Sequence, residues 1–182
     1  MIAHSQTQHF LVTCATENLD HFIRQLVTDL HSTSLDNQKQ AAMEIRLLAK
    51  NKPKNRVKLT KASAIKSLIS LIFSPDLQLQ ECNIIVMLNL SLYDENKKAI
   101  ASADAIKPLV RALSTRTTTT KENATCTLLR LSQVKEHKAV IRLSGMILPS
   151  MSLLESGGFR AKKENKMRAV KVGIIKVSME LT

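Results

Sequence analysis

The sequence is poor in the residues that build β-sheets and tight turns. Its 182 residues include no tryptophan, one tyrosine, four glycines and four prolines, and aromatic residues make up 3% of the chain. Sandwiches and barrels need turn glycines and strands rich in aromatic residues, whereas helices exclude glycine and proline from their interiors. The 44% of apolar residues is enough for one packed domain. The composition therefore predicts an all-α fold.

Motifs that carry catalytic chemistry are missing as well. The sequence contains no HExxH, no P-loop, no GxGxxG pattern and no Gly-x-Ser-x-Gly elbow. The cysteines Cys14, Cys82 and Cys126 have no CxxC spacing, and the five histidines stand at spacings unsuited to a metal. We therefore expect no catalytic residue, no metal and no cofactor, and we expect the thiols to be reduced.

Long apolar runs are absent too. No segment approaches the length of a membrane span, and the short run of Phe10, Leu11 and Val12 is too brief for a secretory signal. Together with the reduced thiols, this predicts a soluble protein of the cytoplasm, the nucleus or both.

Positive charge is plentiful and unevenly distributed. The formal net charge is +12, yet residues 1–50 carry four basic and five acidic side chains while residues 51–182 carry 23 and ten. Such a surface attracts acidic protein segments, nucleic acid or anionic lipid. A solvated lysine-rich surface with no partner explains the charge equally well.

A repeat of 41 residues runs through the chain. The segment that begins at Asn55 recurs from Asn96 and again from His137. The same offset relates apolar positions in further blocks: Ile65, Ile106 and Ile147; Leu47, Leu88 and Leu129; Ala49, Leu90 and Leu131. This period lies in the range of HEAT and armadillo units, which bury their apolar faces by stacking on their neighbours.

Each period divides into three helices by its apolar spacing. In one unit the pattern predicts helices over 96–102, 105–113 and 121–132. The second and third helices would bury these residues: Ile106, Leu109, Val110 and Leu113; Ala124, Leu128 and Leu131.

Breaker residues separate these helices. Ser63, Asp104 and Gly145 stand between the first and second helix of successive units, where a left-handed turn residue is expected. The run 114–120 contains four consecutive threonines, and we expect a loop there because β-branched residues sustain helices poorly.

The repeat also predicts how the chain is organised. A polar segment over 1–19 is expected to be disordered, and a solenoid follows over 20–182. Its parts are a partial cap 20–51, repeats 52–92 and 93–133, a shortened repeat 134–164 and a terminal fragment 165–182. The shortened repeat lacks 13 residues that correspond to 123–135, nearly a whole third helix. We expect this incomplete repeat to dock loosely and to promote self-association, because its apolar residues lose their covering.

Particular phrases of the sequence are similar to the armadillo consensus. They are Leu88-Asn89-Leu90-Ser91 and Pro108-Leu109-Val110. More narrowly, the phrases over 77–81, 106–113, 121–124 and 129–134 resemble the armadillo region of plant U-box ubiquitin ligases and of their U-box-lacking relatives. The resemblance implies a right-handed superhelix of three-helix repeats that binds partner or substrate proteins, with a link to plant ubiquitination or signalling.

The resemblance also bears on activity. The U-box of these ligases precedes the repeats, and only about 20 residues stand there in this sequence. We therefore expect no U-box and no enzymatic activity.

The resemblance places a binding groove on the third helices of the repeats. Two rows of residues would line it: Glu44, Ile85 and Cys126, then Leu48, Asn89 and Arg130. Nuclear-import adaptors of this fold hold lysine-rich peptides with Trp and Asn in these rows, and here Asn89 alone matches. Arg130, with Lys121 on the same helix, suits an acidic or phosphorylated segment, although Arg130 could equally be a solvated helix residue.

The alternative function is a basic solenoid that binds nucleic acid or acts as a nuclear transport adaptor. The charge permits nucleic-acid binding, but one tyrosine and four phenylalanines offer few stacking platforms. Protein binding is the favoured interpretation.

Overall fold

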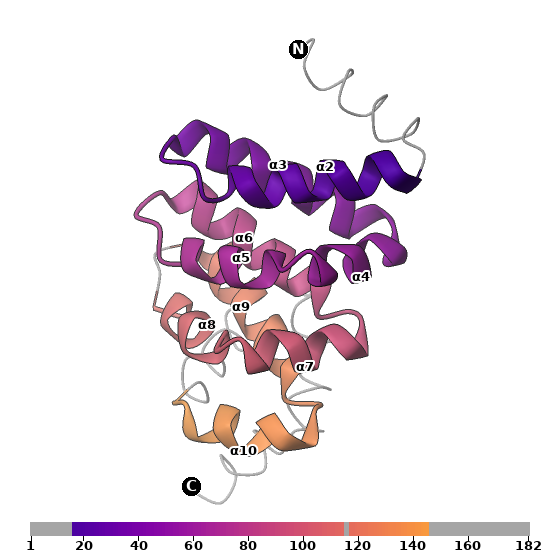
Figure 1. The fold of residues 1–182 in the computed structure, drawn as a ribbon. Helices are drawn as coiled ribbons and strands as arrows, with labels where there is room; N and C mark the ends of the chain where they lie inside the picture. Colours follow the sequence, from indigo (N-terminus) through magenta and orange to yellow (C-terminus); the bar gives the residue numbers. More distant parts are fainter. Residues whose placement is uncertain (1–15, 115–116, 146–182) are drawn as a thin grey trace, which may run out of the picture.

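The computed structural model describes residues 16–114 and 117–145, and this part of the chain forms nine α-helices and no strand (Figure 1). The helices are α2 (Thr16–Asp29), α3 (Leu35–Asn51), α4 (Pro53–Lys61), α5 (Ala64–Leu71), α6 (Leu77–Leu90), α7 (Asp94–Ser102), α8 (Ile106–Ala112), α9 (Thr118–Leu131) and α10 (Lys135–Leu143). The prediction of an all-α fold is confirmed.

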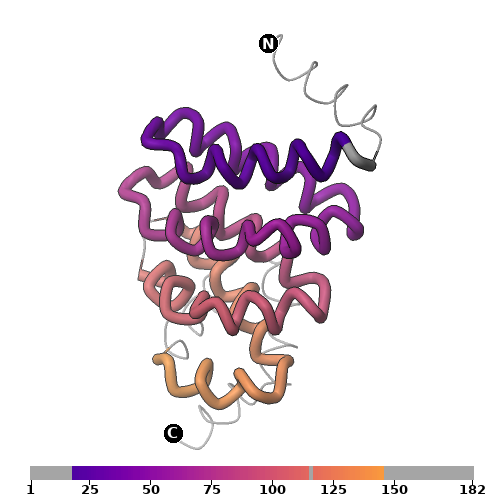
Figure 2. Tube along the Cα trace, viewed as in Figure 1, coloured from indigo at the N-terminus to yellow at the C-terminus, as the bar shows by residue number. Residues whose placement is uncertain are grey.

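The helices form a stack of three-helix units. The first helices are α4, α7 and α10, the second are α2, α5 and α8, and the third are α3, α6 and α9. Figure 2 shows each unit following the previous one down the stack. In Figure 1, α5 and α8 lie in front of α6 and α9, so the first and second helices cover one side, here called the outer face.

Local sequence signals start several of these helices. Asp76 precedes α6, and its Oδ1 accepts a hydrogen bond of 2.8 Å from the backbone N–H of Leu79. Ser34 precedes α3 and accepts from the N–H of Asn37 at 3.4 Å. Pro53 is the first residue of α4, where its missing N–H costs nothing.

The expected left-handed residues lie between the first and second helices. Ser63, Asp104 and Gly145 have φ values of 63°, 61° and 79°. Each of these residues follows the end of a first helix, although two of them carry a side chain that disfavours the conformation. The prediction made from the repeat is confirmed at all three positions.

The core follows the 41-residue period. Leu59, Ile100 and Ile141 come from successive first helices, and each is 0% exposed. The predicted faces of α8 and α9 are also inside: Ile106, Leu109, Leu113, Ala124, Leu128 and Leu131 are buried, and Val110 is half-buried. Because α6 packs between α3 and α9, these faces join into one continuous core. Full burial of each large side chain stabilises the fold by about 1.5–3 kcal/mol.

The threonine run is more helical than the sequence predicts. The expected loop over 114–120 is wrong at its end, because α9 begins at Thr118. Thr120 is fully buried, and the Thr117 hydroxyl donates to the Thr120 hydroxyl at 2.6 Å. The weak helix propensity of a β-branched residue amounts to a few tenths of a kcal/mol, so the burial of Thr120 outweighs it.

Predictions about the two ends of the chain can be compared with the structure only in part. Helix α2 begins at Thr16, inside the segment 1–19 that the sequence predicts to be disordered. The remainder of that segment, most of the shortened repeat 134–164 and the terminal fragment 165–182 lie outside the described residues. The loose docking of the last repeat therefore stays a prediction.

Asparagines at the start of the repeat join consecutive elements. The Asn55 side-chain N–H donates to the Leu48 carbonyl at 3.2 Å, so it satisfies the end of α3. Asn96 occupies the same position one unit later and donates to the carbonyls of Leu90 and Arg56, both at 3.2 Å. Asn96 is 2% exposed and thus links the end of α6 to α4 of the preceding unit.

Replacing Asn96 with alanine should lower the free energy of unfolding by about 1–3 kcal/mol, because two hydrogen bonds between elements are lost and the carbonyls of Leu90 and Arg56 each lose one of their donors. Urea denaturation followed by far-ultraviolet circular dichroism measures this change. Asn51→Ala is the matched control, since Asn51 is the exposed last residue of α3. Equal destabilisation by the two variants would show that the Asn96 bonds do not hold the units together.

Candidate functional site

The third helices present a line of half-buried side chains. Ile85 and Asn89 lie one turn apart on α6, and Cys126 and Arg130 occupy the equivalent positions on α9. Residues four apart share one side of a helix, and the 41-residue offset repeats that side from α6 to α9. We call these four residues the third-helix face. None of them belongs to the fully buried core.

The members of the two rows that come from α3 are placed differently. Glu44 is 6% exposed and Leu48 is 3% exposed. The Gln40 side-chain amide donates to Glu44 Oε1 at 2.8 Å. The surface that the two rows offer to a partner therefore comes mainly from α6 and α9.

Lys121 does not share a side of α9 with Arg130. The two residues are nine positions apart, about two and a half helical turns, which places them on opposite sides of α9. Within α6 and α9 the charged residues are two basic and two acidic: Lys121, Arg130, Glu81 and Glu122. Taken as whole helices, α6 and α9 therefore carry no net charge.

A small hollow of about 320 Å³ lies between α3 and α6. It is lined by Met43, Arg46, Leu77, Gln78, Glu81 and Cys82. Cys82 and Cys126 are free thiols, and Cys14 lies outside the described residues. Burial raises the pKa of the Cys82 thiol from 9.0 to about 11, while the nearby charge of Arg46 acts in the opposite direction. Cys82 is therefore a protonated, weakly nucleophilic thiol near neutral pH.

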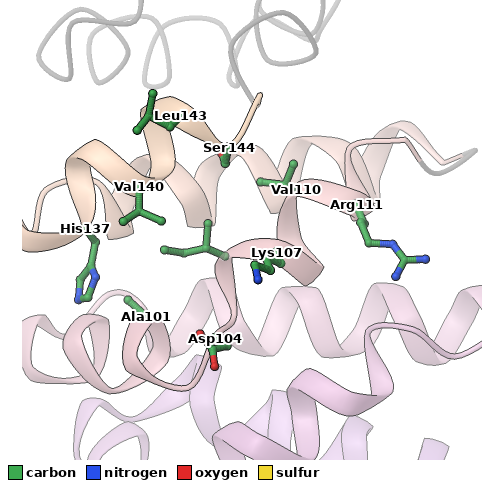
Figure 3. A pocket seen from close by; sticks show the side chains of 10 residues that line it. Ala101, Asp104, Lys107, Val110, Arg111, His137, Val140, Leu143 and Ser144 are labelled. Carbon is green, nitrogen blue, oxygen red and sulfur yellow. The ribbon is translucent and has the colours of Figure 1, made fainter.

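A larger hollow of about 780 Å³ lies between α8 and α10 (Figure 3). The sequence did not predict a binding site at this place. We call it the α8–α10 cleft. Its lining includes Ile106, Val110, Val140 and Leu143, with Lys107, Arg111 and His137 around them. One feature of the sequence could have indicated this cleft: the apolar Leu143 occupies the repeat position at which the two earlier units have the polar residues Lys61 and Ser102.

Metal and membrane sites are not evident in the part of the chain that the structure describes. Within 16–114 and 117–145, no three histidine, cysteine or acidic residues gather as a metal would require. No helix in these ranges is long and apolar enough to span a membrane.

Comparison with known proteins agrees with this architecture. The family profile of the Armadillo/beta-catenin-like repeat matches residues 94–133. U-box domain-containing protein 2 of Arabidopsis thaliana is 39% identical over 85 residues, which is 47% of this chain and 12% of that protein. The E3 ubiquitin-protein ligase SPL11 of Oryza sativa subsp. japonica is 41% identical over 73 residues, which is 40% of this chain and 10% of that protein. This chain thus spans a small part of the length of either relative.

A solved structure shows the same fold. The designed armadillo repeat protein YIII(Dq.V1)4CPAF, in complex with the peptide (KR)4, superposes with a TM-score of 0.74 over 97% of this chain and 78% of that chain, at 18% identity. The fold is therefore an armadillo-type solenoid, a class of protein-binding scaffolds. Within that class, this chain carries the armadillo repeat, and its repeats are similar to those of plant U-box proteins.

The buried thiol predicts how stability depends on pH. Between about pH 9 and 11 the unfolded chain loses the Cys82 proton while the folded chain keeps it, so stability falls as pH rises through this window. We expect Cys82→Ala to retain about 2 kcal/mol more of its unfolding free energy than the natural chain between about pH 8 and 11. Urea denaturation at several pH values measures the difference.

Cys82→Ser is the companion variant, because it removes the same ionisable group but packs differently. Its pH slope should match that of Cys82→Ala. Identical slopes for the natural chain and both variants would contradict the raised pKa.

Proposed function

We propose that this chain is a protein-interaction module that binds a segment of a partner along the third helices. The observation that carries the proposal is the third-helix face, which stays partly exposed although it runs through the most tightly stacked layer of the fold. Stacking uses other sides of α6 and α9, where Leu79, Leu90, Leu128 and Leu131 are fully buried. The four residues of the face keep part of their side chains exposed.

The chemistry of the face supports binding of a peptide chain. Asn89 offers an amide that can donate and accept hydrogen bonds with a peptide backbone, and Ile85 beside it offers apolar contact. Arg130 is the one basic group of the face, so preference for an acidic or phosphorylated segment rests on Arg130 alone.

The biological setting is proposed from the relatives. The similarity covers the armadillo part of U-box proteins, and armadillo repeats are not catalytic. We propose that the chain recruits a partner or substrate in a ubiquitin-linked pathway of the cytoplasm or nucleus. Self-association through the last repeat stays a prediction, because most of the residues concerned lie after Gly145.

Substitution of the third-helix face should reduce partner binding. Asn89→Ala combined with Arg130→Glu should lower the amount of protein captured from plant extract at least about tenfold, as expected when central groups of an interface are lost. Quantitative mass spectrometry of nuclease-treated extract measures the capture. Asn89→Ala alone should change the free energy of unfolding by about 0.5 kcal/mol or less.

The matched control combines Asn51→Ala with Arg24→Glu, the same exchanges at exposed positions of α3 and α2. It should capture the same proteins as the natural chain. Unchanged capture by the double variant of the face would refute the proposal. Capture that disappears on nuclease treatment would favour the nucleic-acid alternative.

The chain should be silent in ubiquitin transfer. The similarity to U-box proteins covers their armadillo part, which is not catalytic. In a reconstituted reaction with activating and conjugating enzymes, we expect no polyubiquitin chains on an immunoblot. Robust chain formation by the purified protein would overturn the view of this chain as a recruiting module.

A further inference from the structure

We propose that the α8–α10 cleft is a second docking surface, which binds an amphipathic acidic helix of a partner protein. The cleft lies on the outer face, whereas the proposed peptide site lies on the third helices (Figures 1 and 3). The two surfaces use different residues, so either can exist without the other.

The floor of the cleft is apolar and open. Val140 is 53% exposed and Leu143 is 87% exposed, both on α10, and Val110 of α8 is half-buried. Figure 3 shows Val140 pointing from α10 toward α8, whereas Leu143, which is also part of the lining, projects from the other side of the α10 ribbon. A volume of about 780 Å³ is typical of a site that receives several large side chains. Exposed apolar surface that is concentrated in one hollow indicates a partner.

The exposure of Leu143 is not explained by its position close to Gly145, the last described residue. Its counterparts in the two preceding units are Lys61 and Ser102, and both are exposed although another unit follows each of them. The position therefore faces solvent in a regular stack, and adding a further unit does not require leucine there. An apolar residue at a solvent-facing repeat position is explained by contact with another molecule.

The rim of the cleft is basic. Lys107 and Arg111 lie one turn apart on α8 and are exposed, and neither forms an ion pair with a described residue. Arg111 sits over the ring of Phe73, which is not part of the lining, with its guanidinium carbon 4.8 Å from the ring centroid. The remaining charged or titratable groups of the lining are Asp104 and His137. Two carboxylates one turn apart on a partner helix match the spacing of Lys107 and Arg111.

The charge of the whole outer face points the same way. Helices α2, α4, α5, α7, α8 and α10 carry thirteen basic and six acidic residues, whereas the third helices α3, α6 and α9 carry five basic and four acidic residues. An acidic partner is therefore attracted to the outer face over a long range, which raises its rate of association. Helical partners place apolar residues at positions i, i+3, i+4 and i+7 into such a hollow.

Two other occupants are considered. A second copy of the chain brings a net charge of +12 to a basic surface, so charge complementarity favours an acidic partner over a second copy. The chain's own residues 146–182 include seven basic and three acidic side chains, but 146–159, which follow Gly145 directly, include one acidic and no basic side chain. Charge does not disfavour these residues, and the variants of Ile147 and Leu154 described below distinguish them from a partner.

Selection of peptides tests the proposal. A phage library of random peptides about 16 residues long, able to form a helix of several turns, is selected against the complete chain at low salt. We expect enriched peptides to combine apolar residues at i, i+3, i+4 and i+7 with Asp or Glu. Fluorescence anisotropy of these peptides should show affinity at least about tenfold weaker for Leu143→Lys and for Lys107→Glu.

The controls use the repeat itself. Leu143→Lys introduces the residue found at position 61, so the variant should fold like the natural chain. Lys66→Glu reverses the equivalent lysine one unit before Lys107, outside the cleft, and should leave affinity unchanged. Asn89→Ala should also leave it unchanged, which separates this site from the proposed groove.

Several outcomes would overturn the proposal. Absence of enriched peptides, enrichment of basic peptides, or affinity insensitive to Leu143→Lys would each exclude an acidic helix. Light scattering measures whether the chain is a dimer. A dimer that the Leu143→Lys substitution dissociates would assign the cleft to a second copy of the chain. Tighter peptide binding after Ile147→Asp with Leu154→Asp would assign it to the chain's own following residues.

Discussion

Stacking of one three-helix unit on the next is the constraint on which this structure depends. A single unit has apolar sides on its second and third helices and cannot bury both alone. Leu59, Ile100 and Ile141, one from each unit, reach complete burial because the units adjoin. Helix α6 shows the principle most clearly, since α3 covers one of its sides and α9 another. The 41-residue period of the sequence is the consequence of this shared geometry.

Polar contacts keep the units in register. Asn96 bonds to carbonyls of α6 and α4, and Lys39 of α3 pairs with Asp76 at the start of α6 at 2.6 Å. This pairing with Lys39 lowers the pKa of Asp76, and the same carboxylate caps α6. Apolar burial supplies most of the stability, whereas directional bonds choose one relative placement of neighbouring units among several of similar burial.

The two sides of the stack differ in chemistry. Stacking leaves the third helices with a narrow face whose one charged group is Arg130. The outer face contributes little to stacking between third helices and has accumulated lysines and arginines. The two proposed binding surfaces share no residue.

The sequence by itself determined the class of fold, the period, the turn positions Ser63, Asp104 and Gly145, and most of the core, because these features depend on local spacing that repeats along the chain. It was wrong about the threonine run, where burial of Thr120 by neighbouring elements outweighs propensity. The sequence could name the rows of the candidate face from resemblance, but it could not foresee that Glu44 and Leu48 are buried. The placement of Lys121 opposite Arg130 follows from their nine-residue separation once both lie in one helix. Only the tertiary structure decided the α8–α10 cleft, since Val110 and Val140 are 30 residues apart and meet through the angle at which one unit packs on the next.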